Sequence, residues 1–328
     1  MPLVSVIVPN YNHAPYLRQR LDSIYNQTFQ DFEVIILDDC STDNSKEIIE
    51  EYRNRQQTSH IVYNEFNSGS PFKQWAKGFD LAQGEYIWIA ESDDWAEINF
   101  LEIMVDALNQ DFNSVFAFCD MFMVFPEKTI EYHFSKKSKN FNGIKFIKTK
   151  QLYENNIINA SAVVFRKKIL SFIPSDYQAF KGSGDYMFWS YISEHGTIFY
   201  EHNLLNYFRR HPLNTTKKNN FQGLTFQEGH KIFEYFQSKN YITFFTRYRI
   251  VQNKLEQIEN CKPFFINLET YYFSKKLWLS TINNGWFGKM LLAIASIANI
   301  FNSNLPPIAK FWKIFHLPNT NFRHNLSK

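Results

Sequence analysis

Short apolar runs alternate with helical patterns four times in about the first 110 residues of the chain. The runs are residues 4–8, 34–37, 61–63 and 86–90, and the segments between them repeat apolar side chains at steps of three and four. This alternation predicts a parallel sheet joined by right-handed helical crossovers. The run 34–37 is apolar throughout, as expected of a strand that is covered on both faces. We therefore expect an α/β fold.

Acidic side chains follow directly after two of these predicted strands. They are Asp38 and Asp39 after the second run, and Glu91, Asp93 and Asp94 after the fourth. Ligands of open α/β sheets bind outside the carboxyl ends of the strands. Clustered carboxylates repel one another, and a hard divalent cation bound together with substrate phosphates would offset that repulsion. The alternative is that Asp93 or Asp94 only caps the next helix.

Several kinds of site are absent from the sequence. No Gly-x-Gly-x-x-Gly follows the first strand and no Gly-Lys-Ser/Thr loop occurs, which argues against the common dinucleotide and phosphate-loop folds. The net charge of +3 does not indicate a nucleic-acid partner. Three widely spaced cysteines argue against disulfides or zinc and fit a reducing compartment. Neither a signal peptide nor an apolar run of about 18 residues is visible, so we expect a cytoplasmic protein.

The alternation loosens after residue 110. We expect strands at 115–119, 162–165, 199–200 and 204–208, and a polar surface excursion over 131–150. The loop 181–184 leads Asp185 into an aromatic helix, and the chain from about residue 225 onward is helical and aromatic. We predict two domains, residues 1–218 and residues 219–328.

Three motifs in the first part of the chain occur in a recognisable order. They are Val-Ser-Val-Ile-Val-Pro-Asn-Tyr-Asn at 4–12, Asp-Asp-Cys-Ser-Thr-Asp at 38–43, and Gly-Glu-Tyr-Ile-Trp-Ile-Ala-Glu-Ser-Asp-Asp at 84–94. The ordered set resembles the family 2 glycosyltransferases over residues 3 to 216. The resemblance implies a GT-A fold, with a mostly parallel sheet flanked by helices, and an inverting enzyme that uses nucleotide-diphospho-sugars. A mainly helical C-terminal region would follow that fold.

The resemblance also assigns a nucleotide site. Pro9 and Tyr11 would line the base pocket, with Tyr11 stacked on the nucleobase. Asp39 would accept a hydrogen bond from a uracil-type N3–H, and Asp93 would reach the ribose. Lys77 would approach the diphosphate or the base; the alternative is an ordinary solvated lysine on a helix face.

A metal site and a basic loop are implied in the same way. Asp94 would bind Mg²⁺ or Mn²⁺, and Glu91 stands where the family's Asp-x-Asp element has aspartate. Arg209 and Arg210 would pair with the diphosphate. His211 would contact the diphosphate with them or bind the metal, and the alternative is a plain surface histidine.

Asp185 matches the position of the family's general base. A lone carboxylate on the acceptor side of the sugar would take the acceptor hydroxyl's proton as its oxygen attacks the anomeric carbon in line. The alternative is that Asp185 caps the helix beginning at Tyr186, and one residue can do both.

The end of the chain is basic and aromatic. Residues 271–328 contain no Asp or Glu, while lysine, arginine and tryptophan are interleaved there. This pattern predicts contact with an anionic membrane surface, at the inner face of the plasma membrane. The alternative is that these aromatics pack on the catalytic domain.

Together these features predict a hexosyl- or N-acetylhexosaminyltransferase. The donor would be a nucleotide-sugar, most simply UDP-linked, and the acceptor a glycan or lipid-linked glycan in bacterial surface polysaccharide synthesis. A pyrophosphorylase lacks support because the glycine-rich first loop is missing, and nothing supplies the cleft of a glycoside hydrolase. A non-catalytic scaffold that uses the same fold is the alternative function.

Overall fold

The computed structural model describes residues 1–210 and 222–282. Met1–Trp278 form one compact unit, and Leu279–Lys328 are grouped as a second. The predicted domain boundary at 218–219, the candidate His211 and the basic tail after residue 282 lie outside the described residues.

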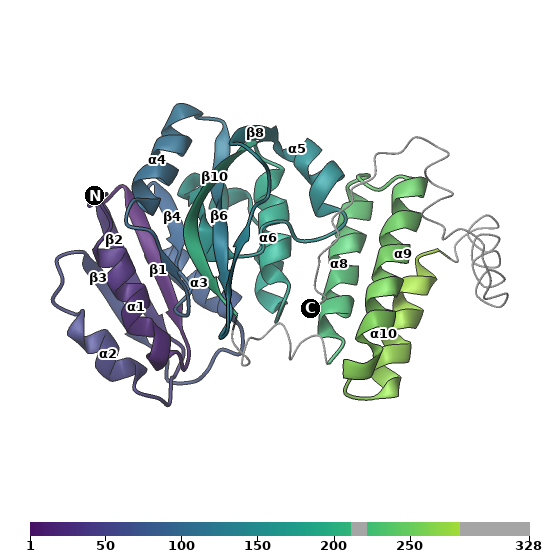
Figure 1. Ribbon diagram of the computed structural model, residues 1–328, viewed down its shortest axis with the longest axis horizontal. Helices are drawn as coiled ribbons and strands as arrows, with labels where there is room; N and C mark the ends of the chain where they lie inside the picture. Colours follow the sequence, from purple (N-terminus) through teal and green to yellow (C-terminus); the bar gives the residue numbers. More distant parts are fainter. Residues whose placement is uncertain (211–221, 283–328) are drawn as a thin grey trace. The chain divides into compact units, whose positions relative to one another are not determined.

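A central sheet runs through the first unit (Figure 1). Its strands are β1 (Val4–Asn10), β2 (Phe32–Asp38), β3 (Thr58–Tyr63), β4 (Tyr86–Ile89), β5 (Trp95–Ala96), β6 (Ser114–Val124), β7 (Thr129–Tyr132), β8 (Lys139–Asn142), β9 (Val163–Arg166) and β10 (Thr197–Arg209). The order is β3-β2-β1-β4-β9-β6-β10-β5, with β7 paired to β6 and β8 to β10. The expected parallel arrangement holds for β1 to β4, whereas β9 runs antiparallel to both of its neighbours.

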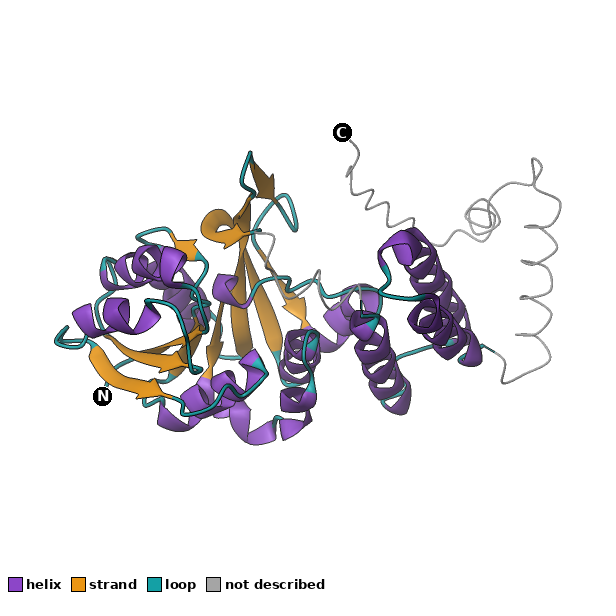
Figure 2. Ribbon diagram, turned by 90° about the horizontal axis from the view of Figure 1, so that it is seen from below, coloured by secondary structure: helices purple, strands orange, loops and turns teal. Residues whose placement is uncertain are grey.

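Helices connect the strands and continue the chain after them (Figure 2). They are α1 (Ala14–Tyr25), α2 (Ser45–Glu51), α3 (Pro71–Leu81), α4 (Phe100–Gln110), α5 (Gly143–Phe146), α6 (Gly184–Ser193), α8 (Leu224–Ser238), α9 (Phe244–Cys261) and α10 (Leu268–Ser280). Short 3-10 turns lie at Ala160–Ala162, Lys167–Phe172, Ser175–Ala179 and Lys262–Phe264, and a π-helical turn at Ile147–Gln151. None of the helices within residues 1–210 and 222–282 combines the length and the apolar character needed to cross a membrane.

Each face of the sheet is covered by its own set of helices. Alternate residues of β1, such as Val6, join a cluster with the apolar sides of α1, α2 and α4. On the opposite face, Phe79 of α3 and Phe188 of α6 contact Phe165 of β9 with ring centroids 5.7 and 5.6 Å away. Gly78 of α3 lies so close to Ile7 that a Cβ there would be 2.4 Å from that side chain. The mixed α/β architecture agrees with the predicted fold class, including a helical C-terminal part.

Two segments differ from their predictions. Residues 199–200 and 204–208 belong to one long strand, β10, whose pairing with β6 is interrupted by bulges. The segment 131–150, which we expected to be a polar surface loop, contains the end of β7 and all of β8. Its side chains Phe134 and Phe146 are buried. Its apolar residues are few and lie among lysines and other polar residues, so no helix or strand period marked them in the sequence.

Candidate active site

The carboxyl ends of β2, β1 and β4 are adjacent in the sheet. The last register pair of β1 and β2 joins Asn10 to Asp38, and the amide N–H of Asp39 donates to the Asn10 carbonyl at 2.8 Å. The segment from Glu91 to Asp94 follows β4, the neighbour of β1 on its other side. The two predicted acidic segments therefore meet at one edge of the sheet.

Asp39 is buried and fixed by a ring of donors. Its carboxylate accepts hydrogen bonds from Asn64 Nδ2 (2.7 Å), Gln74 Nε2 (2.8 Å), and the amide and hydroxyl of Ser68 (2.9 and 2.8 Å). Lys77 Nζ donates to Asn64 Oδ1 at 2.6 Å. Lys77 therefore joins the Asp39 network through Asn64.

Tyr11 leaves the end of β1 as an exposed aromatic side chain, with 46% of its surface accessible. Pro9 is buried in β1 and pairs in register with Leu37. Asn12 has a positive φ of 55°, and its Oδ1 accepts from the Thr42 amide at 2.7 Å, which fixes the loop. This geometry leaves the Tyr11 ring accessible for stacking on a flat ligand.

Asp94 is buried and bonded to three donors. Oδ2 accepts from Asn159 Nδ2 (2.8 Å) and Ser161 Oγ (2.7 Å), and Oδ1 accepts from the Arg209 amide (2.9 Å). Burial raises the pKa of the Asp94 carboxyl to about 7, and the charge of Asp93 adds to this rise. Neither aspartate caps the next helix, because α4 begins only at Phe100, after the N-cap residue Asn99.

Glu91 and an unpredicted arginine complete the acidic end of β4. Glu91 Oε1 accepts from Trp75 Nε1 at 2.9 Å, and burial, followed by the charge of Asp93, raises the pKa of Glu91 to about 8. Arg20 of α1 is fully buried with its guanidinium 4.7 Å from the centre of the Trp88 ring. No described residue accepts a hydrogen bond from its three nitrogens. Burial lowers the pKa of the guanidinium to about 10, although the negative charges of the nearby acids raise it. Arg20 therefore acts on the acids through space.

The two basic candidates at the end of β10 differ in their surroundings. The Arg209 guanidinium lies 4.6 Å from the ring centres of both Tyr16 and Trp95, and its Nε donates to the Asp93 carbonyl at 2.8 Å. Arg209 thus supports the acidic turn. Arg210 is half-buried 4.9 Å from the Phe208 ring, and burial lowers the pKa of its guanidinium.

The residues present could hold a divalent cation only together with phosphate oxygens of a bound substrate. Within the described residues, no three His, Cys, Asp or Glu side chains form a group that would hold a metal. Carboxylate oxygens suit Mg²⁺ or Mn²⁺, and such ions are commonly held by one or two carboxylates plus substrate phosphates. Asp94 Oδ1 accepts a single hydrogen bond and Glu91 accepts one from Trp75 through Oε1, so each retains a lone pair for a cation.

Asp185 lies in the first turn of α6, behind the N-cap residue Ser183. Its Oδ2 accepts a hydrogen bond from Asn155 Nδ2 at 2.8 Å. Burial raises the pKa of the Asp185 carboxyl to about 7, although its hydrogen bonds lower it. A carboxyl that titrates near neutral pH is suited to general-base work.

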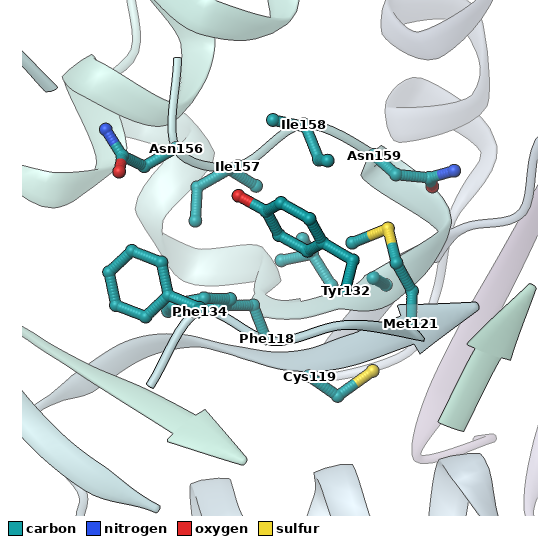
Figure 3. A pocket seen from close by; sticks show the side chains of 11 residues that line it. Phe118, Cys119, Met121, Tyr132, Phe134, Asn156, Ile157, Ile158 and Asn159 are labelled. Atoms are coloured by element: carbon teal, nitrogen blue, oxygen red, sulfur yellow. The ribbon is translucent and has the colours of Figure 1, made fainter. Parts of the chain in front are cut away.

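One short segment joins this carboxyl to the acidic end of β4. Asn155 bonds to Asp185, while Asn159 bonds to Asp94, four residues further along the same segment. The segment is tightened by bonds from the Ile157 amide to Asn155 Oδ1 (3.1 Å) and from the Ser161 amide to Asn159 Oδ1 (2.6 Å). Figure 3 shows a small pocket beside it, with the Tyr132 ring facing Ile157. Asp94 and Asp185 are therefore positioned by a common strap, residues 155–161.

The strap was not among the predicted site residues. Its only sequence signal is the amide-rich run Asn155, Asn156 and Asn159 before a β-prone stretch, which alone indicates a loop. Arg20 was missed as well, although its spacing of three residues from Leu17 and four from Ile24 places it on the buried face of α1.

Comparisons with known proteins identify the family of the chain. Residues 5–172 match the sequence profile described as glycosyl transferase family 2. The chain is 41% identical over 93 residues to the putative teichuronic acid biosynthesis glycosyltransferase TuaG of Bacillus subtilis, covering 28% of this chain and 36% of that protein. It is 30% identical over 192 residues to an uncharacterized glycosyltransferase of Methanocaldococcus jannaschii, covering 57% and 63%. The chain thus spans less than two thirds of either relative.

A similar fold occurs in a solved glycosyltransferase. The crystal structure of Staphylococcus aureus TarS residues 1–349 in complex with UDP-GlcNAc superposes with a TM-score of 0.58 at 18% identity. The superposition covers 86% of this chain and 89% of that one. Since the family profile matches more than half of its 328 residues, the chain belongs to glycosyl transferase family 2.

Proposed function

We propose that this enzyme transfers a sugar, with inversion, from a UDP-linked donor to a hydroxyl group of a glycan or lipid-linked glycan. The observation that carries this proposal is the strap, which links a near-neutral carboxyl, Asp185, to the acidic end of β4 through Asn155 and Asn159. The names of the relatives support the setting. TuaG is named for teichuronic acid biosynthesis and TarS as a poly(ribitol-phosphate) β-N-acetylglucosaminyltransferase, so assembly of a bacterial surface polysaccharide is the proposed role.

The proposed chemistry assigns the proton transfer to Asp185. In its ionised form the carboxylate accepts the proton of the acceptor hydroxyl while that oxygen attacks the anomeric carbon from the side opposite the diphosphate. Asn155 orients the carboxylate through Oδ2. The proton stays on Asp185 until product leaves, and solvent removes it afterwards.

The proposed nucleotide site lies at the ends of β1 and β2. The exposed Tyr11 ring stacks on the base, with Pro9 behind it, and Asp39 faces the base edge from its fixed position. Asp93 reaches the ribose. Arg210, whose guanidinium has no hydrogen-bond acceptor among the described residues, is the stronger candidate for the diphosphate than the ring-stacked Arg209.

Asp94, with Glu91 as a second ligand, would hold the cofactor Mg²⁺ or Mn²⁺ against the diphosphate, and His211 stays a candidate ligand from the loop that follows β10. A bound ion of this kind supplies positive charge that stabilises the departing diphosphate. The protein's own part is to keep oxygen ligands buried and oriented at the end of β4.

A donor screen tests this proposal. The parent protein is incubated with UDP-, GDP- and dTDP-sugars with and without Mn²⁺, and nucleotide release is measured. We expect Mn²⁺-dependent hydrolysis of a UDP-sugar and its loss in Asp94→Ala, with weaker UDP binding in thermal-shift measurements. A scaffold on the same fold would release no nucleotide and show no stabilisation by UDP and Mn²⁺, and that result would refute the proposal.

We also propose that the C-terminal region contacts an anionic membrane surface, which would place the enzyme at the inner face of the plasma membrane. The described part of this region exposes large apolar side chains before and within α10, among them Phe264, Ile266 and Phe273. Truncation after residue 285 should abolish co-flotation with vesicles of phosphatidylglycerol and phosphatidylcholine. Equal flotation of the truncated and full chains would contradict this part of the proposal.

A further inference from the structure

We propose that Glu228 of α8 is a positioning residue that holds the loop in front of Asp185, so that the helical C-terminal region takes part in building the active site. This inference rests on the proposed role of Asp185 as the general base. Glu228 lies 43 residues beyond Asp185 in the chain and is only 4% exposed. A carboxylate with so little access to water needs strong partners.

Those partners are three consecutive backbone amides. Glu228 Oε1 accepts from the Lys181 amide at 2.6 Å, and Oε2 accepts from the amides of Gly182 and Ser183 at 3.0 and 2.7 Å. Successive amides that converge on one carboxylate form a strong, charge-assisted anchor. Because α6 begins immediately afterwards with Gly184 and Asp185, the anchor fixes where the Asp185 side chain starts.

The other side of the loop is held by α3 and the turn before it. Ser70 Oγ donates to the Phe180 carbonyl at 3.0 Å. Phe72 packs against Gly184 so closely that a Cβ on this glycine would lie 2.5 Å from its ring. The loop 181–183 is thereby clamped between α3 and α8, and without Glu228 only one side of the clamp remains.

Glu228 also acts on Asp185 by its charge. Burial is the main cause of the raised pKa of Asp185, and the negative charge of Glu228 adds to it. Tyr186 is the other titratable side chain that interacts with Asp185, and the pKa of its hydroxyl is raised far above the working range. Removal of the Glu228 charge should therefore lower the pKa of Asp185, which provides a signature distinct from general destabilisation.

The test compares Glu228→Gln with Glu234→Gln, a change of the same type at an exposed position of α8. The glutamine turns an NH₂ group toward the loop amides and breaks part of the anchor. We expect at least a tenfold fall in turnover of the UDP-sugar that the parent hydrolyses fastest, with KM and UDP affinity within threefold of the parent. The acid limb of the pH–rate profile should move to lower pH. Glu234→Gln should match the parent in all these measurements.

Parent-like turnover and an unmoved acid limb in Glu228→Gln would overturn the inference. If this variant fails to fold, amide hydrogen exchange measured on the parent protein tests the inference instead. Amides 181–183 should exchange as slowly as those within α6, and rapid exchange there would equally overturn it. Asp185→Asn separates this result from the proposed function. If Asp185→Asn is inactive while Glu228→Gln is not, only the role of Glu228 fails; if Asp185→Asn retains turnover, the assigned base itself fails.

Discussion

The two acids at the end of β2, Asp38 and Asp39, are bonded very differently from Asp185 at the start of α6. Asp38 accepts from Asn10 Nδ2, the Ser41 amide and the Ser41 hydroxyl at 2.7, 2.9 and 2.6 Å, and Asp39 is ringed by donors in the same way. Asp185 accepts one side-chain hydrogen bond, and its pKa is raised to about 7 by burial.

The difference separates two uses of a buried carboxylate. A carboxylate with all its acceptor positions filled ties loops to strand ends, and its charge is already stabilised. A carboxylate that is buried with few hydrogen-bond donors retains the desolvation cost of its charge, which a bound proton or cation would remove. The β2 acids thus hold the loops at the strand ends in shape, whereas Asp185 retains the capacity to react.

The largest expected effect comes from Asp185→Asn. The amide cannot accept a proton, so transfer should fall by about 10²- to 10⁴-fold, the usual contribution of a general base. UDP binding should stay close to that of the parent, since Asp185 does not belong to the nucleotide side. Steady-state transfer rates and UDP titration calorimetry measure the two properties. Asp176→Asn, an exposed carboxylate bonded to Tyr191, is the control and should remain active.

Stability provides the second test, with the same substitution on both sides of the comparison. Folding raises the pKa of the Asp185 carboxyl from the ordinary value of about 4 to about 7. The contribution of this carboxyl to the free energy of unfolding is therefore fully present below pH 4 and is lost as the pH rises through about 7. Asp185→Asn should therefore stabilise the protein by about 4 kcal/mol at pH 8 and by only about 1 kcal/mol at pH 5. Asp38→Asn removes an acceptor from three donors and should destabilise by about 1–3 kcal/mol.

Urea unfolding at pH 5 and pH 8 measures these free energies. If Asp185→Asn and Asp38→Asn both destabilise at pH 8, the two kinds of carboxylate do not differ as we describe.

A smaller effect is expected for Asn155→Ala. The hydrogen bond from Asn155 lowers the pKa of Asp185, so its loss should raise that pKa. A net hydrogen-bond free energy of about 0.7 kcal/mol corresponds to a shift of about half a pH unit. The acid limb of the pH–rate profile should move upward, with slower transfer at pH 6 and a rate near that of the parent at pH 9. Asn156→Ala removes a side chain that donates to the Glu154 carbonyl and should leave the limb unmoved.

The same two sides differ in how far sequence reasoning could reach them. Asp39 and Asp94 directly follow strands with clear apolar runs, so their place at one edge of the sheet could be predicted. Asn155, Asn159 and Glu228 reach the site from a loop and from a helix far along the chain. Their partners are set by tertiary packing, which leaves no local period in the sequence.

Irregular pairing hid other features of the fold. The bulges of β10 interrupt its apolar alternation near residues 201–204, so one strand resembles two. The antiparallel insertion of β9 between β4 and β6 has no local signature either, because strand direction depends on the connection and not on the residues of the strand.

The smallest expected effect concerns Lys77, where the sequence left two interpretations open. Its ammonium donates to Asn64 Oδ1, and Asn64 Nδ2 in turn donates to Asp39. Lys77→Met keeps the aliphatic stem but frees Asn64 to rotate, which should loosen one of the donors around Asp39. UDP affinity should fall by about three- to tenfold, which corresponds to the loss of one hydrogen bond of about 1 kcal/mol. Lys168→Met, at an exposed lysine outside the site, should bind UDP like the parent. Identical affinities for the two variants would mean that Lys77 is an ordinary surface lysine, and that the network around Asp39 holds its shape without it.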